Sequence, residues 1–440
     1  MSSTDQSGQL GADFKRRSPT LFAVVLFFLL FSGPPSFRLR DPSDSLEGVI
    51  DPTVVFQVSV WVVAGIWTLY QLRKEFRARS PIKLGLPDKL GLWMILFLGL
   101  SSFLSDAPLL TAFKVGQIFV SLLFTWLFVY RYGIAKCIDY VFLGSTILCV
   151  AIAISAFAAP DLVLFSDEGH MRLRGDPIAV MGTVGTYSMI LLFIKRREIP
   201  RVIFWPLLAM LCTLLAYSLT RQAWFLVIAS LLLYVARRSK GTFVRKLGFL
   251  FLAILPFVFF FYLLPALQEY RATESVATLT GRTDLWVYLV GVALLRSPWI
   301  GLGYYSASRI LGPDFNPGMG TAHSIFVEVF LGGGLVSLIP CMALCFLLVR
   351  KAFQFLYKDR TDLEFLCGLL FIVTFTISLL GGDFSSGEIG ITFWSLAAAI
   401  PALSLRRPVP HSPVSAPIHS KLSPIAGKRL ITPDGRRATT

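Results

Sequence analysis

The chain has 440 residues, of which 55% are hydrophobic, and its mean hydropathy is +0.68. Forty-one lysines and arginines against 26 acidic residues give a formal net charge of +15. The apolar content excludes an ordinary soluble domain and predicts a polytopic α-helical membrane protein. Basic loops beside anionic lipid headgroups account for the positive charge of such a protein, so we expect membrane lipids and no nucleic acid as its charged partners.

Apolar segments of about 20 residues, the length that crosses a bilayer as a helix, recur along the whole chain. We expect about 12 transmembrane helices, at 20–33, 50–71, 90–105, 109–130, 137–158, 177–194, 202–218, 222–236, 247–265, 323–348, 363–380 and 389–404. The predicted organisation is a cytoplasmic tail at 1–19, transmembrane helices within 20–265, an exported loop at 266–322, further transmembrane helices within 323–404, and a basic, disordered cytoplasmic tail at 405–440.

The basic residues sort to one side of this layout. Most lie in the two tails and in the loops at 72–89, 131–136, 195–201, 237–246 and 350–362. Because basic loops stay in the cytoplasm, we assign this side, with both termini, to the cytoplasm. On the opposite, exported side the basic residues are all arginines, namely Arg38, Arg40, Arg172, Arg174, Arg221, Arg271, Arg282, Arg296 and Arg309. Topology does not explain these arginines.

Lys114 falls inside the fourth predicted span. A charged side chain at membrane depth is costly and marks a candidate substrate-binding residue, although Lys114 is also near enough to the exported edge to extend its amine into the headgroup region. The six cysteines lie in or beside spans without zinc-binding or CxxC spacing, so we expect small buried residues. Since no exported group of carboxylates suits a divalent cation, neither a metal nor a cofactor is expected.

The longest exported loop, 266–322, is predicted to be a structured cap. Within it, residues 285–295 (LWVYLVGVALL) are strongly apolar. They are too few to cross about 30 Å of hydrocarbon, so they predict a short interfacial helix. Thr283 suits the N-cap of this helix and Asp284 its first turn. Glycines and prolines between Gly301 and Gly320 then predict a series of turns.

Arg221, Arg282 and His323 are the candidate catalytic residues. Arg221 lies in a very short exported connection, Arg282 at the start of the interfacial helix, and His323 at the start of the tenth span. Guanidinium groups bind phosphate oxygens in pairs, and histidine exchanges protons near neutral pH. Together they predict a site for an anionic lipid headgroup. Arg221 also has a structural interpretation as a helix-end anchor, and His323 has one as a cap or a packed polar residue. For Arg296 and Arg309 the structural interpretation is favoured.

Four short motifs follow one another between residues 218 and 335. They are Thr220-Arg221-Gln222-Ala223-Trp224, Gly281-Arg282-Thr283-Asp284-Leu285-Trp286, Ser297-Pro298-Trp299-Ile300-Gly301-Leu302-Gly303, and Ala322-His323-Ser324 followed by Gly332-Gly333-Gly334. In order, side and spacing they resemble the O-antigen ligase and polymerase family of bacterial surface-polysaccharide assembly, which includes exopolysaccharide polymerases. The family usually has His-Asn where this chain has His323-Ser324, so any role of that amide does not carry over.

The resemblance implies glycosyl transfer on the periplasmic face of the bacterial inner membrane. The donor would be a glycan on undecaprenyl diphosphate, and the acceptor a sugar hydroxyl of lipid A–core or of another lipid-linked glycan. The family's diphosphate-binding arginines correspond to Arg221 and Arg282, and its essential histidine corresponds to His323. Besides Lys114, the candidate substrate-binding residues are Arg174, Asp284, Trp286 and Gly303.

Under this interpretation, His323 acts as a general base and direct attack inverts the anomeric centre. The modest size of the exported loop slightly favours a polymerase over a ligase. The alternative is a transporter or flippase for polysaccharides or lipid-linked glycans. Such proteins tend to have repeated halves and ionisable residues near the midplane of the membrane, whereas the polar residues of this chain gather in the exported cap.

Overall fold

The computed structural model describes residues 18–32, 52–78, 85–167, 170–173, 180–218, 220–238, 282–315, 321–357, 361–381, 384–385 and 387–404. All of these residues lie in one compact unit, residues 1–405. The second unit, residues 406–440, lies outside the described residues. So do residues 1–17, the predicted span at 247–265 and the first part of the predicted exported loop, up to residue 281.

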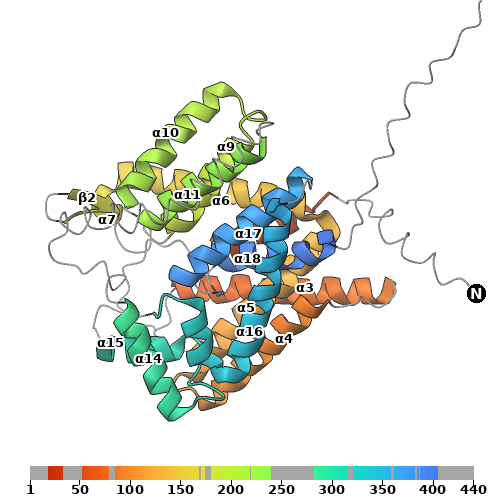
Figure 1. The fold of residues 1–440 in the computed structure, drawn as a ribbon, viewed down its shortest axis with the longest axis vertical. Helices are drawn as coiled ribbons and strands as arrows, with labels where there is room; N and C mark the ends of the chain where they lie inside the picture. Colours follow the sequence, from red (N-terminus) through yellow and green to blue (C-terminus); the bar gives the residue numbers. More distant parts are fainter. Residues whose placement is uncertain are drawn as a thin grey trace, which may run out of the picture. The chain divides into compact units, whose positions relative to one another are not determined.

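The described part of the chain is almost entirely helical (Figure 1). Its helices are α1 (Leu21–Ser32), α3 (Pro52–Ala78), α4 (Leu86–Leu100), α5 (Pro108–Tyr132), α6 (Ile134–Ala158), α7 (Pro160–Val163), α9 (Thr186–Ile194), α10 (Arg201–Ser218), α11 (Arg221–Arg238), α14 (Arg282–Arg296), α15 (Ser306–Phe315), α16 (Ile325–Tyr357), α17 (Asp362–Leu380) and α18 (Gly387–Ser404). A 3₁₀ turn, η2 (Ser101–Leu104), extends α4, and a π-helix, η3 (Met181–Gly185), precedes α9. Two short strands, β1 (Leu164–Asp167) and β2 (His170–Leu173), form an antiparallel hairpin that the sequence did not predict.

Eight of the described helices are long and apolar enough to cross a membrane: α3, α4 with η2, α5, α6, α10, α16, α17 and α18. Two shorter apolar segments, α1 and Met181–Ile194, coincide with predicted spans, and α11 coincides with the span predicted at 222–236. The protein is therefore an all-α, polytopic membrane protein, as predicted. The total of twelve spans stays a prediction, since it includes 247–265.

Large apolar side chains cover the outer faces of these helices. Leu21, Phe157 and Val202 are 80%, 91% and 81% exposed. A soluble monomer rarely exposes extensive apolar surface, because such surface drives association in water. Against lipid tails the same side chains carry no such penalty, since the lipid is as apolar as they are. The exposed apolar surface is therefore consistent with a chain whose helices are surrounded by lipid.

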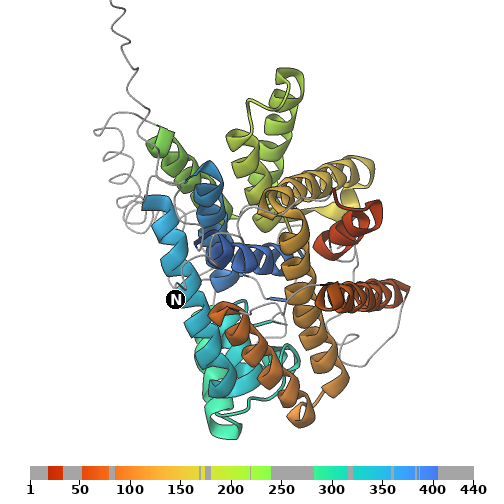
Figure 2. The same ribbon diagram turned by 90° about the vertical axis from the view of Figure 1, so that its right-hand side faces the viewer.

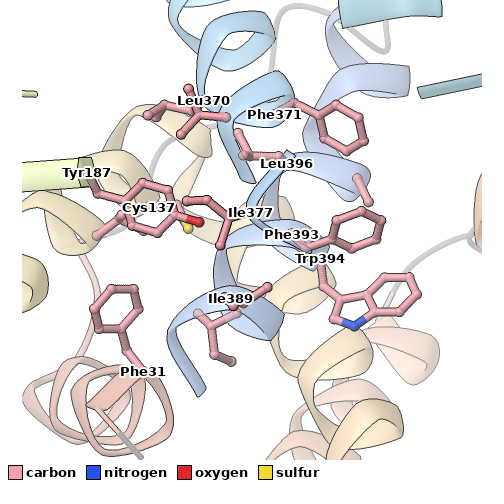
Figure 3. Close-up of a cluster of buried hydrophobic side chains, with 14 of the residues drawn as sticks. Phe31, Cys137, Tyr187, Leu370, Phe371, Ile377, Ile389, Phe393, Trp394 and Leu396 are labelled. Carbon is pink, nitrogen blue, oxygen red and sulfur yellow. The ribbon is translucent and has the colours of Figure 1, made fainter. Parts of the chain in front are cut away.

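The core lies where α5, α16, α17 and α18 pack together, with α4 beside α16 (Figures 1 and 2). In the span formed by α18, 72% of the residues are buried. Its Phe393 and Trp394 pack with Phe371 of α17 in the cluster that Figure 3 shows. The hydroxyl of Tyr187 on α9 donates to Thr374 on α17 at 2.9 Å. All six cysteines are free thiols; five are buried, as predicted, whereas Cys212 is partly exposed.

Ion pairs join segments that the charge pattern placed on the same, cytoplasmic side. Arg131, in the last turn of α5, donates to Glu75 of α3 at 2.7 and 3.0 Å, and both side chains are about one-tenth exposed. Lys195, after α9, pairs with Asp139 of α6. Removing one partner of a buried ion pair lowers the stability of the fold strongly, because it leaves an uncompensated buried charge. These contacts support the grouping of the loops onto one side.

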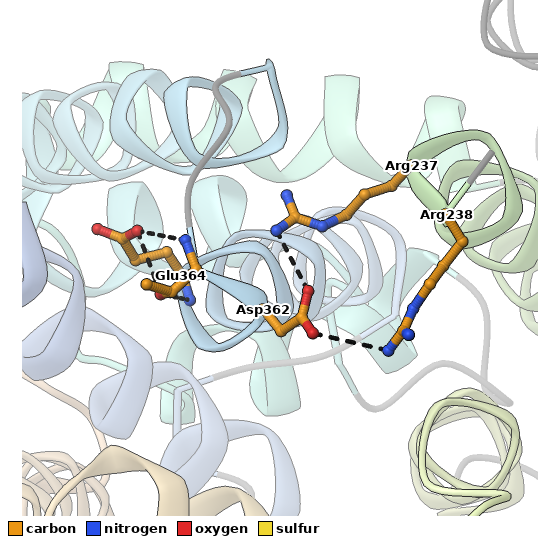
Figure 4. A network of polar contacts seen from close by, with 5 residues as sticks. Arg237, Arg238, Asp362 and Glu364 are labelled. Atoms are coloured by element: carbon orange, nitrogen blue, oxygen red, sulfur yellow. Dashed lines mark hydrogen bonds and ion pairs between the residues drawn. The ribbon is translucent and has the colours of Figure 1, made fainter. Parts of the chain in front are cut away.

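The end of α11 meets the beginning of α17 in the same way (Figure 4). Arg237 and Arg238 pair with Asp362 at 3.3 and 3.6 Å. The Asp362 side chain is 77% exposed, so each pair contributes only about 0–1 kcal/mol. Next to it, Glu364 accepts the backbone N–H of Thr361 at 2.9 Å and so closes a capping box at the start of α17. The C-terminal end of α11 is thereby placed against the start of α17.

A break in α16 shapes the other face of the protein. Gly333 and Gly334 have non-helical backbone angles, and φ of Gly334 is +59°. The loop between α14 and α15 fills the break through three backbone hydrogen bonds: Leu335 N–H to Pro298 O (2.9 Å), Val336 N–H to Trp299 O (3.3 Å) and Leu302 N–H to Leu331 O (2.6 Å). Irregular backbone at membrane depth is stable only where protein groups supply its hydrogen bonds. The interlocked loop meets that need and fixes α14 and α15 against α16.

Candidate functional site

The helix α14 presents Arg282 and Trp286 one turn apart, on the same face. The same face packs into a small cluster with α15 and α16 through Leu285, Leu289 and Ala293. The helix begins at Arg282, so Thr283 is already helical and is not the N-cap that the sequence suggested. Asp284 lies exposed in the first turn, as predicted, where a negative charge favours the helix dipole.

Arg282 is partly buried at the start of α14. Burial lowers the pKa of its guanidinium, because desolvation disfavours the charged form. Because the guanidinium of arginine stays protonated in proteins, the group still carries its charge. A partly desolvated guanidinium interacts more strongly with an anion than a fully hydrated one does. This environment suits the binding of phosphate.

His323 lies two residues before α16 in a left-handed backbone conformation, with φ of +51°. Such a conformation costs on the order of 1–3 kcal/mol in a residue other than glycine and persists where its surroundings hold it. The hydroxyl of Thr321 lies 3.2 and 3.1 Å from Nδ1 and Nε2 of the ring, and the ring is partly buried. The sequence placed His323 at the helix start, and the structure places it in the turn that leads into the helix.

The residue before the histidine, Ala322, is held from both sides. The indole N–H of Trp286 donates to its carbonyl oxygen at 2.6 Å, and its own N–H donates to Oε1 of Glu328 at 2.8 Å. The other carboxylate oxygen of Glu328 accepts the hydroxyl of Ser308 on α15 at 3.1 Å. Ala322 is fully buried and Glu328 is 2% exposed. Helices α14, α15 and α16 therefore meet beside His323.

Arg221 is the first residue of α11; its side chain lies outside the described residues. The start of α11 is nevertheless well defined. The hydroxyls of Ser218 and Thr220 lie 2.6 Å apart in the connection that precedes it. Next along the chain, the side-chain amide of Gln222 donates to the carbonyl oxygen of Thr376 on α17 at 2.9 Å. These contacts fix the backbone that carries Arg221.

The helix α17 connects the start of α11 to the start of α16. Phe375, the neighbour of Thr376, packs edge to face with Phe326 of α16, with ring centroids 6.2 Å apart. Phe326 follows His323 by three residues. The helix starts that carry Arg221 and His323 therefore pack against the same turn of α17. Through Trp286, the start of α14 with Arg282 joins the same region.

Two further basic side chains, Lys114 of α5 and Arg309 of α15, pack against Tyr305 of the cap. Nζ of Lys114 lies 4.2 Å from the centroid of its ring, and Cζ of Arg309 lies 4.9 Å from the same point. The guanidinium of Arg309 also donates to the Tyr305 hydroxyl. Lys114 thus points toward the cap. Arg309, which the sequence suggested as a surface anchor, packs within the cap; its four-residue spacing from Tyr305 was the available signal.

Gly303, also a candidate binding residue, lets the cap approach the connection between α4 and α5. Its φ is +110°, and a Cβ added to it would lie 2.3 Å from Oγ of Ser105. The hydroxyls of Ser105, Thr111 and Ser306 form a closed hydrogen-bonded ring at 2.7–2.9 Å around this contact. The contact accounts for a glycine at this position; binding of substrate by Gly303 stays a prediction.

Arg174, the remaining candidate, lies outside the described residues. The π-helix η3 that follows it lies beside the connection to Arg221, since a Cβ on Gly182 would be 3.4 Å from Thr220. Within the described ranges, no group of three His, Cys, Asp or Glu residues could hold a metal ion. A small cavity lined by Pro87, Asp88, Leu122, Trp126, Leu344, Trp394, Ala397 and Ala398 contains none of the candidate residues. The candidate site accordingly consists of the helix starts that carry Arg221, Arg282 and His323.

One comparison with known families gave a match. A family model described as O-antigen ligase matches residues 205–342, a segment that contains Arg221, Arg282 and His323. The match confirms the resemblance that the motifs suggested over this part of the chain. A comparison with curated proteins gave no match. The family match implies a glycosyltransferase-type role in surface-polysaccharide assembly.

Proposed function

We propose that this multi-pass membrane protein, whose residues 205–342 match the O-antigen ligase family, transfers a glycan from undecaprenyl diphosphate to a sugar hydroxyl. The reaction would take place on the periplasmic face of the bacterial inner membrane during O-antigen or exopolysaccharide assembly. The observation that carries the proposal is the meeting of α14 and the His323 turn through Trp286 and Ala322, inside the matched segment.

In the proposed reaction, the acceptor oxygen forms a bond to the anomeric carbon while the bond from that carbon to the diphosphate oxygen breaks. His323 takes the proton of the acceptor hydroxyl, a step that general bases accelerate by about 10²–10⁴-fold. Undecaprenyl diphosphate leaves with added negative charge. Arg282 and Arg221 would stabilise this charge, and the partial burial of Arg282 strengthens the interaction in the transition state.

One-step attack inverts the configuration of the anomeric carbon, so we expect inversion in the product. A lipid diphosphate is already a good leaving group, and the arginines supply positive charge next to it. We therefore expect transfer to proceed without a divalent cation.

The other candidate residues would bind the two glycan substrates. Lys114, held over Tyr305, offers a cation and an aromatic face in the cap. Asp284 is exposed in the first turn of α14, whereas Trp286 has its N–H engaged and would contact a sugar through its ring. The acceptor would be lipid A–core for a ligase or another lipid-linked glycan for a polymerase. We favour the polymerase, because the exported loop predicted at 266–322 is modest in size.

The proposal is tested with purified protein in liposomes, a lipid-diphosphate glycan donor, candidate acceptors and a chelator. We expect a new glycosidic bond, and its loss in Arg282→Ala and His323→Ala. Arg296→Ala, at the exposed far end of α14, is the matched control and should retain transfer. Full transfer by His323→Ala would refute the assigned general base, and a retained anomeric configuration would exclude the one-step reaction. Movement of the donor across the bilayer without bond formation would instead identify a flippase.

A further inference from the structure

We propose that Glu328 is a positioning residue that orients His323 by holding the backbone of Ala322. The inference rests on the proposed function, in which His323 is the general base. Glu328 does not belong to the motifs that carried the family resemblance, and it follows Ala322 by six residues, a spacing at which helical side chains do not meet. It reaches Ala322 because the chain turns through the left-handed residue His323 before α16 begins.

The geometry shows how Glu328 acts on the histidine. The N–H of Ala322 belongs to the peptide unit before that residue, and its carbonyl belongs to the unit that leads into His323. Glu328 accepts the first group at 2.8 Å, and Trp286 donates to the second at 2.6 Å. Because peptide units are planar, these two bonds fix the orientation of both units. The position from which the imidazole projects is thereby set.

Both oxygens of the Glu328 carboxylate are engaged. Oε1 accepts from Ala322, and Oε2 accepts from Ser308, which also lies 3.2 Å from the carbonyl oxygen of Tyr305. Burial of a carboxylate at 2% exposure is costly and is tolerated where hydrogen bonds satisfy it. A carboxylate whose two oxygens both accept hydrogen bonds in this way holds the surrounding structure in place. Its function is to link α15 and α16 to the histidine turn.

Two substitutions distinguish the role of the length of the Glu328 side chain from the role of its negative charge. Glu328→Gln keeps the length of the side chain: its amide oxygen can accept from Ala322 while its amide N–H₂ donates to Ser308. Ser308 then donates to Tyr305 instead. Glu328→Asp keeps the charge but is one methylene shorter, so it cannot reach both partners. If Glu328 positions His323, the Gln variant stays close to wild type, and the Asp variant loses about 10²-fold in kcat with little change in the KM for the donor.

The matched control is Glu364, a carboxylate that is 7% exposed and accepts the backbone N–H of Thr361 at the start of α17. Glu364→Asp shortens a similarly buried carboxylate side chain that does not contact the His323 turn. We expect this variant to have a lower unfolding temperature but an unchanged kcat. A comparable loss of kcat in Glu364→Asp would attribute the Glu328 effect to general destabilisation. A Gln variant as inactive as the Asp variant would show that the charge is required and would overturn the positioning role.

Hydrogen exchange of the peptide that contains Ala322 tests the contact without any assay of transfer. The Ala322 amide should exchange faster in Glu328→Asp than in wild type or Glu328→Gln. An unchanged exchange rate of the Ala322 amide in Glu328→Asp would refute the hydrogen bond between Glu328 and Ala322, independently of the activity of the protein. If exchange follows the prediction but the wild-type protein transfers no glycan, the proposed function is wrong. If His323→Ala still transfers glycan, the assigned general base is wrong. In both cases the structural link between Glu328 and Ala322 stands. The two failures are therefore distinguishable.

Discussion

The indole N–H of Trp286 donates to the carbonyl oxygen of Ala322 at 2.6 Å and joins the helix that begins with Arg282 to the residue before His323. Two motifs that are about forty residues apart in the sequence meet through this bond. An indole reaches a backbone carbonyl in this way only when both backbones are held in place. Here the interlocked loop and the broken helix α16 hold them.

Trp286→Phe should therefore disturb the geometry around His323, and with it kcat, more than it lowers the stability of the fold. Phenylalanine keeps most of the packing but leaves the carbonyl of the fully buried Ala322 without its donor, which costs about 1–3 kcal/mol of unfolding free energy. We expect a lower unfolding temperature in detergent and a reduced kcat. Trp299→Phe is the control, because the Trp299 side chain is 64% exposed. Equal effects of the two substitutions would contradict the role of the indole N–H.

The break in α16 leads to a second prediction, for Gly334→Ala. Gly334 has a φ of +59°, and an added Cβ would lie 2.2 Å from the carbonyl carbon of Trp299, which is backbone and cannot move aside cheaply. The left-handed conformation alone costs about 1–2 kcal/mol with a side chain, and the clash adds to it. We expect poor folding or a large fall in unfolding temperature. Gly291→Ala, in α14 with nothing within 4 Å, should be neutral or gain up to about 1 kcal/mol.

The helices of this protein could be predicted from the sequence, because apolar length alone decides whether a segment can cross a bilayer. Helix α15 could not. Gly312 and Pro313 indicated turns, yet both lie within Ser306–Phe315. Packing of Ala307 and Leu311 of α15 in one cluster with α14 and α16 outweighs the low helix propensity of these two residues. Local composition does not contain that information.

The candidate residues could be selected by residue type, whereas their geometry could not be predicted from the sequence. Arginines on the exported side and a histidine at a helix start indicated the candidates. The contact from Glu328 to Ala322 depends on the positive φ of His323, which no sequence pattern specifies. In the same way, the glycine motif of α16 was recognisable, but the helix break at Gly334 depends on the partner loop that supplies its hydrogen bonds.

The predicted orientation in the membrane is tested by cysteine labelling. The native thiols are free, and five are buried, so with Cys212 replaced by alanine the background should be low. Asp284→Cys and Asp362→Cys each place a thiol at an exposed position. A membrane-impermeant maleimide should label the first in intact spheroplasts and the second only after lysis. The reverse pattern would place the candidate site in the cytoplasm.

Arg282→Lys separates the charge of the guanidinium from its geometry. Lysine keeps one positive charge but lacks the planar pair of donors that matches two phosphate oxygens. If Arg282 stabilises the departing diphosphate, the lysine variant should lose about 10²–10³-fold in kcat, the loss typical of removing one donor that acts in the transition state.

The control for this change is Arg296→Lys, which makes the same substitution at the exposed end of the same helix and should leave transfer unchanged. Wild-type kcat in Arg282→Lys would mean that only a positive charge is needed at this position. An increase in the KM for the donor with kcat unchanged would mean that Arg282 binds the donor equally in the ground and transition states, and would exclude its role in leaving-group departure.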